Sequence, residues 1–195
     1  MVGAAATHST GSRETHEEGS SGAAAHWPVD THRVLRDAGI SIAAYVPDAG
    51  LARLIRAFQD DRGALSVMLT SEQEGVGVVA GAWLGGRRGV LLMQSSGVGN
   101  CVNAFSMLET CSLPFLTVVT MRGEWGEFNP WQVPMGQSTQ RCLENAGLLV
   151  YRAHHAADIP ETVAAAARLA FNSRRALAVL ISQRILGAKT FGEEP

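Results

Sequence analysis

Two carboxylates, Glu72 and Glu74, lie at the junction between a short apolar segment, 65–69, and a glycine-rich apolar segment that ends near Leu84. A carboxylate at the edge of an otherwise apolar element is costly to bury unless it has a partner. The small residues around these two side chains let another surface come very close. A planar heterocycle with a basic ring nitrogen suits such a place, so we expect this segment to bind one.

Several glycines occur in this region and in a second segment further along the chain. Gly75, Gly77 and Gly81 look like a dinucleotide fingerprint, but the spacing is one residue too long and the lysine of a phosphate-binding loop is missing. We therefore expect these glycines to serve close helix packing and close approach of a ligand. Segment 95–100 is polar and joins a strand to a helix. Its backbone amides either hold an anion or a ring edge, or form an ordinary turn.

Two further charged residues follow apolar runs. Asp48 comes directly after Pro47 at an expected strand end, a position typical of a helix N-cap. Arg122 begins a long irregular segment, 121–136, which also carries three large aromatic side chains. Aromatic residues in a loop often mark an interface, and a loop of this length favours a lid or a partner-facing segment.

The elements that position these residues alternate between two periodicities. Nearly continuous apolar runs predict strands, and apolar residues at helical spacing predict helices between them. The expected strands are 40–46, 65–69, 89–93, 114–120, 148–151 and 176–181, and the expected helices are 28–38, 49–59, 73–84, 101–110, 139–145 and 159–172. This order predicts a three-layer α/β/α fold with a mostly parallel sheet of about six strands.

The polar segments fall at the same end of these strands. Ligands of a parallel sheet bind outside the carboxyl ends of its strands. Segments 47–48, 70–74, 94–99 and 121–136 all follow expected strands, so they share one edge of the sheet. The sequence therefore predicts one ligand site at this edge.

Composition limits the classes of partner. The chain has 195 residues, enough for one compact domain, and divides into a disordered tail, 1–26, and a domain, 27–195. A net charge of −2 gives no electrostatic reason to expect nucleic acid or a membrane as partner. Three scattered cysteines form neither a disulfide framework nor a zinc site, so we expect a reduced, cytoplasmic protein with no metal ligands of its own.

Several motifs, in this order along the chain, are similar to those of one enzyme family. They are Val46-Pro47-Asp48, Glu72-Gln73-Glu74-Gly75, Met93-Gln94-Ser95-Ser96-Gly97-Val98-Gly99-Asn100, Leu113-Pro114, Arg122-Gly123 and Gln132-Val133-Pro134-Met135-Gly136. With them the chain resembles the pyrimidine-binding domain of thiamine-diphosphate enzymes. The nearest resemblance is to the alpha subunit of sulfopyruvate decarboxylase and to phosphonopyruvate decarboxylase.

The resemblance implies a role for each matching residue. Glu74, the carboxylate directly before the glycine in the family pattern, would bond the ring nitrogen of the aminopyrimidine, and its burial would raise its pKa and ease proton sharing. Its neighbour Glu72 is the competitor for this role. Asp48 would point toward the reacting centre and relay a proton. The cofactor pocket would be lined by Gln94, Ser96, Gly97, Val98 and Gly99.

The family also implies a division of labour between two chains. A second domain with a Gly-Asp-Gly…Asn motif holds the diphosphate and Mg2+, and this chain contains no Gly-Asp-Gly. The resemblance therefore implies a hetero-oligomer in which a beta subunit presents thiamine diphosphate to this chain. Arg122 and Gln132 are candidates for binding the substrate's distal sulfonate or phosphonate. Gln137 stands where the family often has an arginine, which leaves a less charged or aromatic substrate open.

The implied function is that of a carbon–carbon lyase. It would convert a short anionic 2-oxo acid to an aldehyde and carbon dioxide, and only together with its partner. Two alternatives stay open. One is carboligation, in which the same intermediate attacks a second carbonyl compound, and the other is a non-catalytic regulatory subunit of the same fold.

Overall fold

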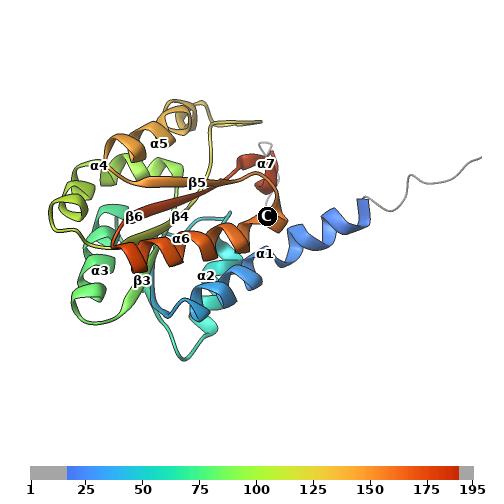
Figure 1. Ribbon diagram of the computed structural model, residues 1–195. Coiled ribbons are helices and arrows are strands. Elements are labelled where there is room, and N and C mark those ends of the chain that lie inside the picture. Colours follow the sequence, from blue (N-terminus) through green and yellow to red (C-terminus); the bar gives the residue numbers. More distant parts are fainter. Residues whose placement is uncertain (1–16, 189–195) are drawn as a thin grey trace, which may run out of the picture.

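In the part of the chain that the structure describes, residues 17–188, six parallel strands form one sheet. In this computed structural model the strands are β1 (Ile40–Tyr45), β2 (Leu65–Met68), β3 (Arg88–Gln94), β4 (Phe115–Thr120), β5 (Leu149–Ala153) and β6 (Ala176–Ile181). Their order across the sheet is β2-β1-β3-β4-β6-β5, and every neighbouring pair is parallel (Figure 1). The expected α/β fold with a parallel sheet is confirmed.

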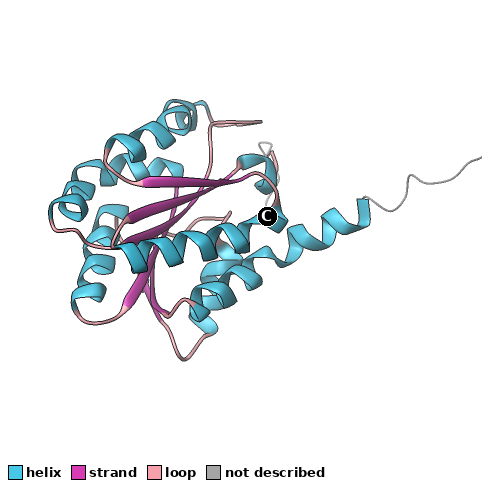
Figure 2. Ribbon diagram, in the orientation of Figure 1, coloured by secondary structure: helices cyan, strands magenta, loops and turns pink. Residues whose placement is uncertain are grey.

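Helices connect the strands and cover both faces of the sheet (Figure 2). They are α1 (Glu17–Asp37), α2 (Ala52–Asp60), α3 (Glu72–Leu84), α4 (Ser95–Thr110), α5 (Val133–Asn145), α6 (Ile159–Ser173) and α7 (Gln183–Leu186), with 3-10 turns η1 (Pro130–Gln132) and η2 (Ala156–Asp158). Successive strand residues point to opposite faces. Leu92 therefore packs with α1, α2 and α6, whereas Leu91 packs with α3, α4 and α5.

Helix α1 is longer than the sequence predicts. It begins at Glu17 rather than at residue 28, so segment 17–26 is helical where a disordered tail was expected. The run of alanines at 23–25 has the strongest intrinsic helix propensity, and it carries the helix into Pro28 from the N-terminal side. The expectation of a tail over 1–16 concerns residues outside the described part of the chain.

Two segments near the ligand edge also differ from expectation. Segment 95–100, expected as a polar loop, forms the first turns of α4, which therefore begins directly where β3 ends. Ser95 and Gly97 are buried there, so close packing outweighs the low helix propensity of glycine. Strand β2 lies at the edge of the sheet, with Leu65 50% and Met68 69% exposed, although segment 65–69 is an apolar run.

The carboxyl ends of the strands meet at one edge of the sheet. Gln94, the last residue of β3, is in register with Thr120, the last residue of β4. Asp48 follows β1, which pairs with β3 on its other side. The topology therefore brings three polar side chains from distant parts of the sequence next to one another.

Candidate active site

A chain of hydrogen bonds crosses the carboxyl edge of the sheet. Asp48 Oδ1 accepts from Gln94 Nε2 at 3.0 Å. Asp48 Oδ2 accepts from Thr120 Oγ1 at 2.7 Å and from the backbone N of Leu51 at 3.2 Å. Gln94 Oε1 in turn accepts from Ser96 Oγ at 2.9 Å. The structure thus brings together three of the residues that the sequence selected, Asp48, Gln94 and Ser96, and fixes the orientation of the Asp48 carboxylate.

Glu72 is the buried carboxylate at the start of α3. The residue is 9% exposed, and its side chain faces α4, where Asn100 Nδ2 donates to Oε2 at 2.8 Å. Oε1 forms no hydrogen bond with any of the described residues. A Cβ at Gly97 would overlap the Glu72 carboxylate, so glycine is needed at this position. The pKa of Cys101 is raised to about 12, mainly because the thiol is buried and secondly because of the negative charge of Glu72.

Glu74, the carboxylate that the family pattern favours, is exposed to solvent. Its Oε1 accepts from Thr70 Oγ1 at 2.6 Å, and Oε2 accepts from Thr70 N at 3.1 Å. These bonds from Thr70 lower the pKa of Glu74, so the expectation of a buried carboxylate with a raised pKa is wrong. Ser71 is the N-cap of α3 and Glu74 its third residue, the Ser-x-x-Glu spacing of a capping box. That spacing was the signal in the sequence for a local structural role.

The glycines of α3 divide into two kinds. A Cβ at Gly75 would collide with Leu91 and Leu69, so the expectation of close packing is correct for this residue. At Gly77 and Gly81 a Cβ would meet no atom of the described residues within 4 Å. The expectation of close packing is therefore wrong for these two positions, which leave open space beside the helix.

Two carboxylates hold the loop after β4 in place. Glu127 Oε2 accepts from Arg122 Nε at 2.7 Å, and Oε1 accepts from Arg122 Nη2 at 2.5 Å. The Glu127 side chain is 3% exposed, and the hydrogen bond from Arg122 lowers the pKa of Glu127 to about 2. Glu124 accepts from Arg152 Nη1 at 2.7 Å and from the backbone N of Gln183 at 2.8 Å.

Sequence reasoning did not assign roles to Glu127 or Gln183. Gln183 Nε2 donates to Glu127 Oε2 at 2.9 Å, although the two residues are 56 positions apart. Gln183 is 3% exposed, at the start of the short helix α7. No local pattern marks these residues, because each owes its burial to a segment far away in the sequence.

The beginning and the end of this loop cross each other, with their backbones in contact. A Cβ on Gly136 would overlap the carbonyl of Arg122, and one on Gly123 would overlap the carbonyl of Gln132. Gln137 Nε2 donates to Gly123 O at 2.9 Å, so Gln137 fixes this crossing. The structure does not bring Gln132 to the pocket described next, and its Oε1 is buried without a hydrogen-bond partner among the described residues.

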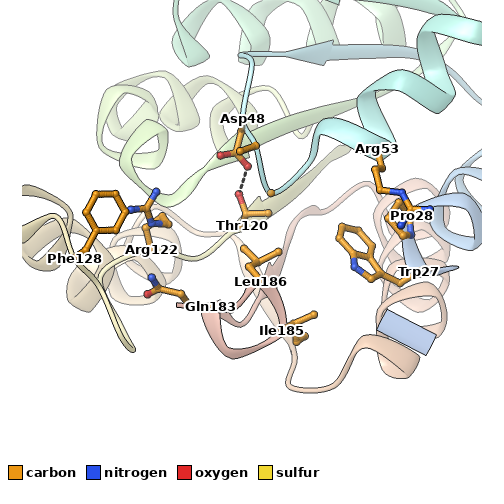
Figure 3. A pocket seen from close by; sticks show the side chains of 13 residues that line it. Trp27, Pro28, Asp48, Arg53, Thr120, Arg122, Phe128, Gln183, Ile185 and Leu186 are labelled. Atoms are coloured by element: carbon orange, nitrogen blue, oxygen red, sulfur yellow. Dashed lines mark hydrogen bonds between the residues drawn. The ribbon is translucent and has the colours of Figure 1, made fainter. Parts of the chain in front are cut away.

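A pocket of about 240 Å³ opens beside the Asp48 carboxylate. Figure 3 shows Asp48 and Thr120 between its two ends, with Arg122 at one end and Arg53 at the other. Its walls also include the apolar or aromatic residues Trp27, Pro28, Phe128, Ile185 and Leu186. The carboxyl edge thus holds two acidic centres, one at Glu72 between α3 and α4 and one at Asp48 beside this pocket.

The other candidate residues lie elsewhere. Val98, a residue of α4, is fully buried in the core, and Gly99 faces Met135 of α5. Across residues 17–188, no group of three or more His, Cys, Asp or Glu side chains is placed to hold a metal ion. In the same residues no helix combines the length and the apolar character needed to cross a bilayer.

Comparison with known proteins gives similar sequences and a similar fold. No protein-family model matches the chain. The alpha subunit of sulfopyruvate decarboxylase from Methanococcus maripaludis is 32% identical over 151 residues, which cover 77% of this chain and 90% of that protein. Phosphonopyruvate decarboxylase from Streptomyces viridochromogenes is 36% identical over 108 residues, 54% of this chain and 27% of that protein.

A solved structure shares the architecture at low sequence identity. The 2-oxoglutarate:ferredoxin oxidoreductase from Magnetococcus marinus aligns with a TM-score of 0.65 at 13% identity, over 82% of this chain and 29% of that one. This likeness shows the fold alone. The sequence similarity, which extends over nearly the whole length of the methanococcal protein, shows more: the chain belongs to the family of sulfopyruvate decarboxylase alpha subunits.

Proposed function

We propose that this chain is the alpha subunit of a cytoplasmic, thiamine-diphosphate-dependent decarboxylase of short anionic 2-oxo acids of the sulfopyruvate or phosphonopyruvate type. The activities named for its relatives support the reaction class. The name "subunit alpha" supports a complex with a second subunit, which in this proposal holds the diphosphate and Mg2+. The observation that carries the proposal is the Glu72 carboxylate, buried against Gly97 at the ligand edge of the sheet.

The surroundings of Glu72 suit an aminopyrimidine ring better than those of Glu74. Asn100 holds Oε2, which leaves Oε1 to bond a ring nitrogen. Gly97 has no side chain, which leaves room for the Glu72 carboxylate to pack against α4. In Glu74, by contrast, both carboxylate oxygens already accept hydrogen bonds from Thr70. We therefore transfer the cofactor-binding role from Glu74 to Glu72.

Asp48 is the proposed proton-handling group on the substrate side. Thr120 and Gln94 donate to its two oxygens, which holds the carboxylate at the pocket wall in a single orientation. Loss of carbon dioxide from a 2-oxo acid leaves a carbon that must gain one proton before the aldehyde departs. A fixed carboxylate that takes up a proton from water can relay it to that carbon. Thiamine diphosphate, when bound, supplies the nucleophilic carbon and the electron sink for the breaking carbon–carbon bond.

Matched variants of the two glutamates test this assignment in the complex with the partner subunit. We expect Glu72→Gln to lower kcat roughly 100-fold or more, because a neutral amide cannot share the ring proton. Glu74→Gln, which changes the same atoms two residues away, is expected to keep kcat within about threefold, since it alters only a surface cap.

The direct measurement is hydrogen–deuterium exchange at C2 of the bound cofactor, followed by NMR after acid quench. Exchange slowed only by Glu72→Gln supports the assignment. Exchange and turnover slowed only by Glu74→Gln would restore the family-pattern choice, and normal exchange in both variants would remove both carboxylates from the role.

A further inference from the structure

The pocket beside Asp48 contains two guanidinium groups with different surroundings. Arg122 is already paired, through two hydrogen bonds of 2.7 Å and 2.5 Å to Glu127. Its guanidinium also lies over the ring of Phe128, with 5.3 Å between the Cζ atom and the ring centroid. A second anion at Arg122 would have to compete with a carboxylate that is bonded in two places. Arg122 and Glu127 together present a pair without net charge.

Arg53 is the unpaired cation of this pocket. It lies in the first turn of α2 and is exposed, and its side chain forms no hydrogen bond or ion pair with any of the described residues. The first turn of α2 also carries no acidic side chain that would offset the positive end of the helix. Figure 3 shows Arg53 beside Pro28 and Trp27, at the end of the pocket away from Arg122.

We propose that Arg53 binds the distal tetrahedral oxyanion of the substrate, a sulfonate or a phosphonate, at the Trp27 end of this pocket. The inference rests on the proposed function and names the residue that selects its substrate class. Such an acid carries a negative charge at each end, and Arg53 is the arginine of this pocket whose side chain has no carboxylate partner among the described residues, so the distal anion lies there. The reacting end then lies toward Asp48, and the three-carbon acid extends along the pocket.

The apolar lining strengthens this contact and limits the size of the ligand. Trp27, Ile185 and Leu186 reduce water around the tail, which makes a charge-assisted hydrogen bond stronger. A Cβ at Gly50 would lie 3.0 Å from Asp48 Oδ2 and 3.1 Å from Leu186 Cδ1, so glycine keeps the pocket open. A volume of about 240 Å³ is below the roughly 300–1,000 Å³ of sites for drug-sized ligands. The pocket therefore favours a small, charged acid over a bulky aromatic one.

The test compares Arg53→Gln with Arg56→Gln in the complex with the partner subunit. Arg56 is also an exposed arginine of α2, but it does not line this pocket. The substrates are sulfopyruvate, phosphonopyruvate and pyruvate, the last of which lacks the distal anion. We expect Arg53→Gln to raise KM for the first two acids about 10- to 100-fold, because a charge-assisted hydrogen bond typically contributes this much to affinity. The value of kcat should stay within about threefold of wild type. KM for pyruvate should stay unchanged.

Two further variants separate binding from a structural effect. Arg53→Lys keeps the charge and should recover part of the lost affinity, whereas Arg56→Gln should leave all three KM values unchanged. An equal KM change for pyruvate and sulfopyruvate, or no change for any acid, overturns the role of Arg53 and leaves the proposed decarboxylase intact. A wild-type complex that decarboxylates none of the three acids overturns the proposed function and this inference with it.

Discussion

At the scale of single residues, the donors around a carboxylate decide what it can do. Glu72 and Glu74 are two positions apart, so their side chains leave the helix about 200° apart. One meets Asn100 and Gly97 on the neighbouring helix, and the other returns to Thr70 at its own N-terminus. The same residue type therefore serves the interior in one case and the helix cap in the other.

Glu127 gives the clearest prediction for stability at this scale. We expect Glu127→Gln to lower the free energy of unfolding at pH 7 by about 2 kcal/mol, because the partly buried charge of Arg122 loses its partner. The pKa of Glu127 is lowered from 4.5 to about 2 in the folded protein, so its contribution is full above pH 4.5 and fades as the pH falls toward 2. The difference between wild type and variant should shrink over that interval.

Urea denaturation at pH 7, 5 and 3 measures this effect. Glu109→Gln is the control, because Glu109 is exposed and its side chain forms no hydrogen bond or ion pair with the described residues. It should change the free energy of unfolding by less than about 0.5 kcal/mol at each pH. A Glu127→Gln loss that stays constant from pH 7 to 3 would show that its ionised form does not stabilise the fold.

At the scale of elements, the loop after β4 is anchored by hydrogen bonds at its beginning. Glu124 ties it to β5 and α7, and Glu127 ties its first turn to Arg122. Trp131, further along, is 85% exposed. A loop anchored in this way suits a pocket wall better than a moving lid. Contact of Trp131 with the partner subunit stays a prediction.

Two glycine substitutions of opposite sign test how these elements pack. Gly136→Ala should destabilise the chain by about 1–3 kcal/mol or more, since its Cβ would overlap the backbone carbonyl of Arg122. Gly81→Ala lies inside α3 with open space around it, and should stabilise by about 0.5–1 kcal/mol through helix propensity. Thermal unfolding of the isolated chain gives both values, and equal shifts for the two variants would contradict the crossing of the two backbones.

The arrangement of elements was mostly predictable, and the exceptions share a cause. The six strands appear close to their expected bounds, because apolar runs of this length leave little choice. The first turns of α4 were expected as a loop, since Ser96, Gly97 and Gly99 have weak helix propensity. Contacts with α3 and α5 stabilise them as a helix, and those contacts are not visible in a local pattern.

At the scale of the whole molecule, the parallel topology produces a single functional edge. The order β2-β1-β3-β4-β6-β5 places the ends of β1, β3 and β4 side by side. Asp48, Gln94 and Thr120 come from these three ends, and α3 and α4 bring Glu72 to the same edge. In our proposal the partner subunit presents the cofactor to this edge.

Dependence on the partner is the prediction at this scale. The chain alone should decarboxylate no 2-oxo acid, and titration with the beta subunit should give activity that saturates at a fixed ratio, because each chain supplies only part of the cofactor site. Dilution below the dissociation constant of the complex should abolish activity, and analytical ultracentrifugation at the same concentrations reports assembly. Turnover by the chain alone, proportional to its concentration, would contradict the division of the site.

The sequence by itself determined the sheet, its ligand edge and the family, because strand patterns and short motifs are local properties of the chain. It also placed Asp48, Gln94 and Ser96 at that edge, since each follows a strand. In our proposals, the choice of Glu72 over Glu74 and of Arg53 over Arg122 rests on the tertiary structure alone. Burial and pairing arise where distant segments meet: Asn100 and Gly97 enclose one carboxylate, and Glu127 neutralises one arginine while leaving the other free among the described residues.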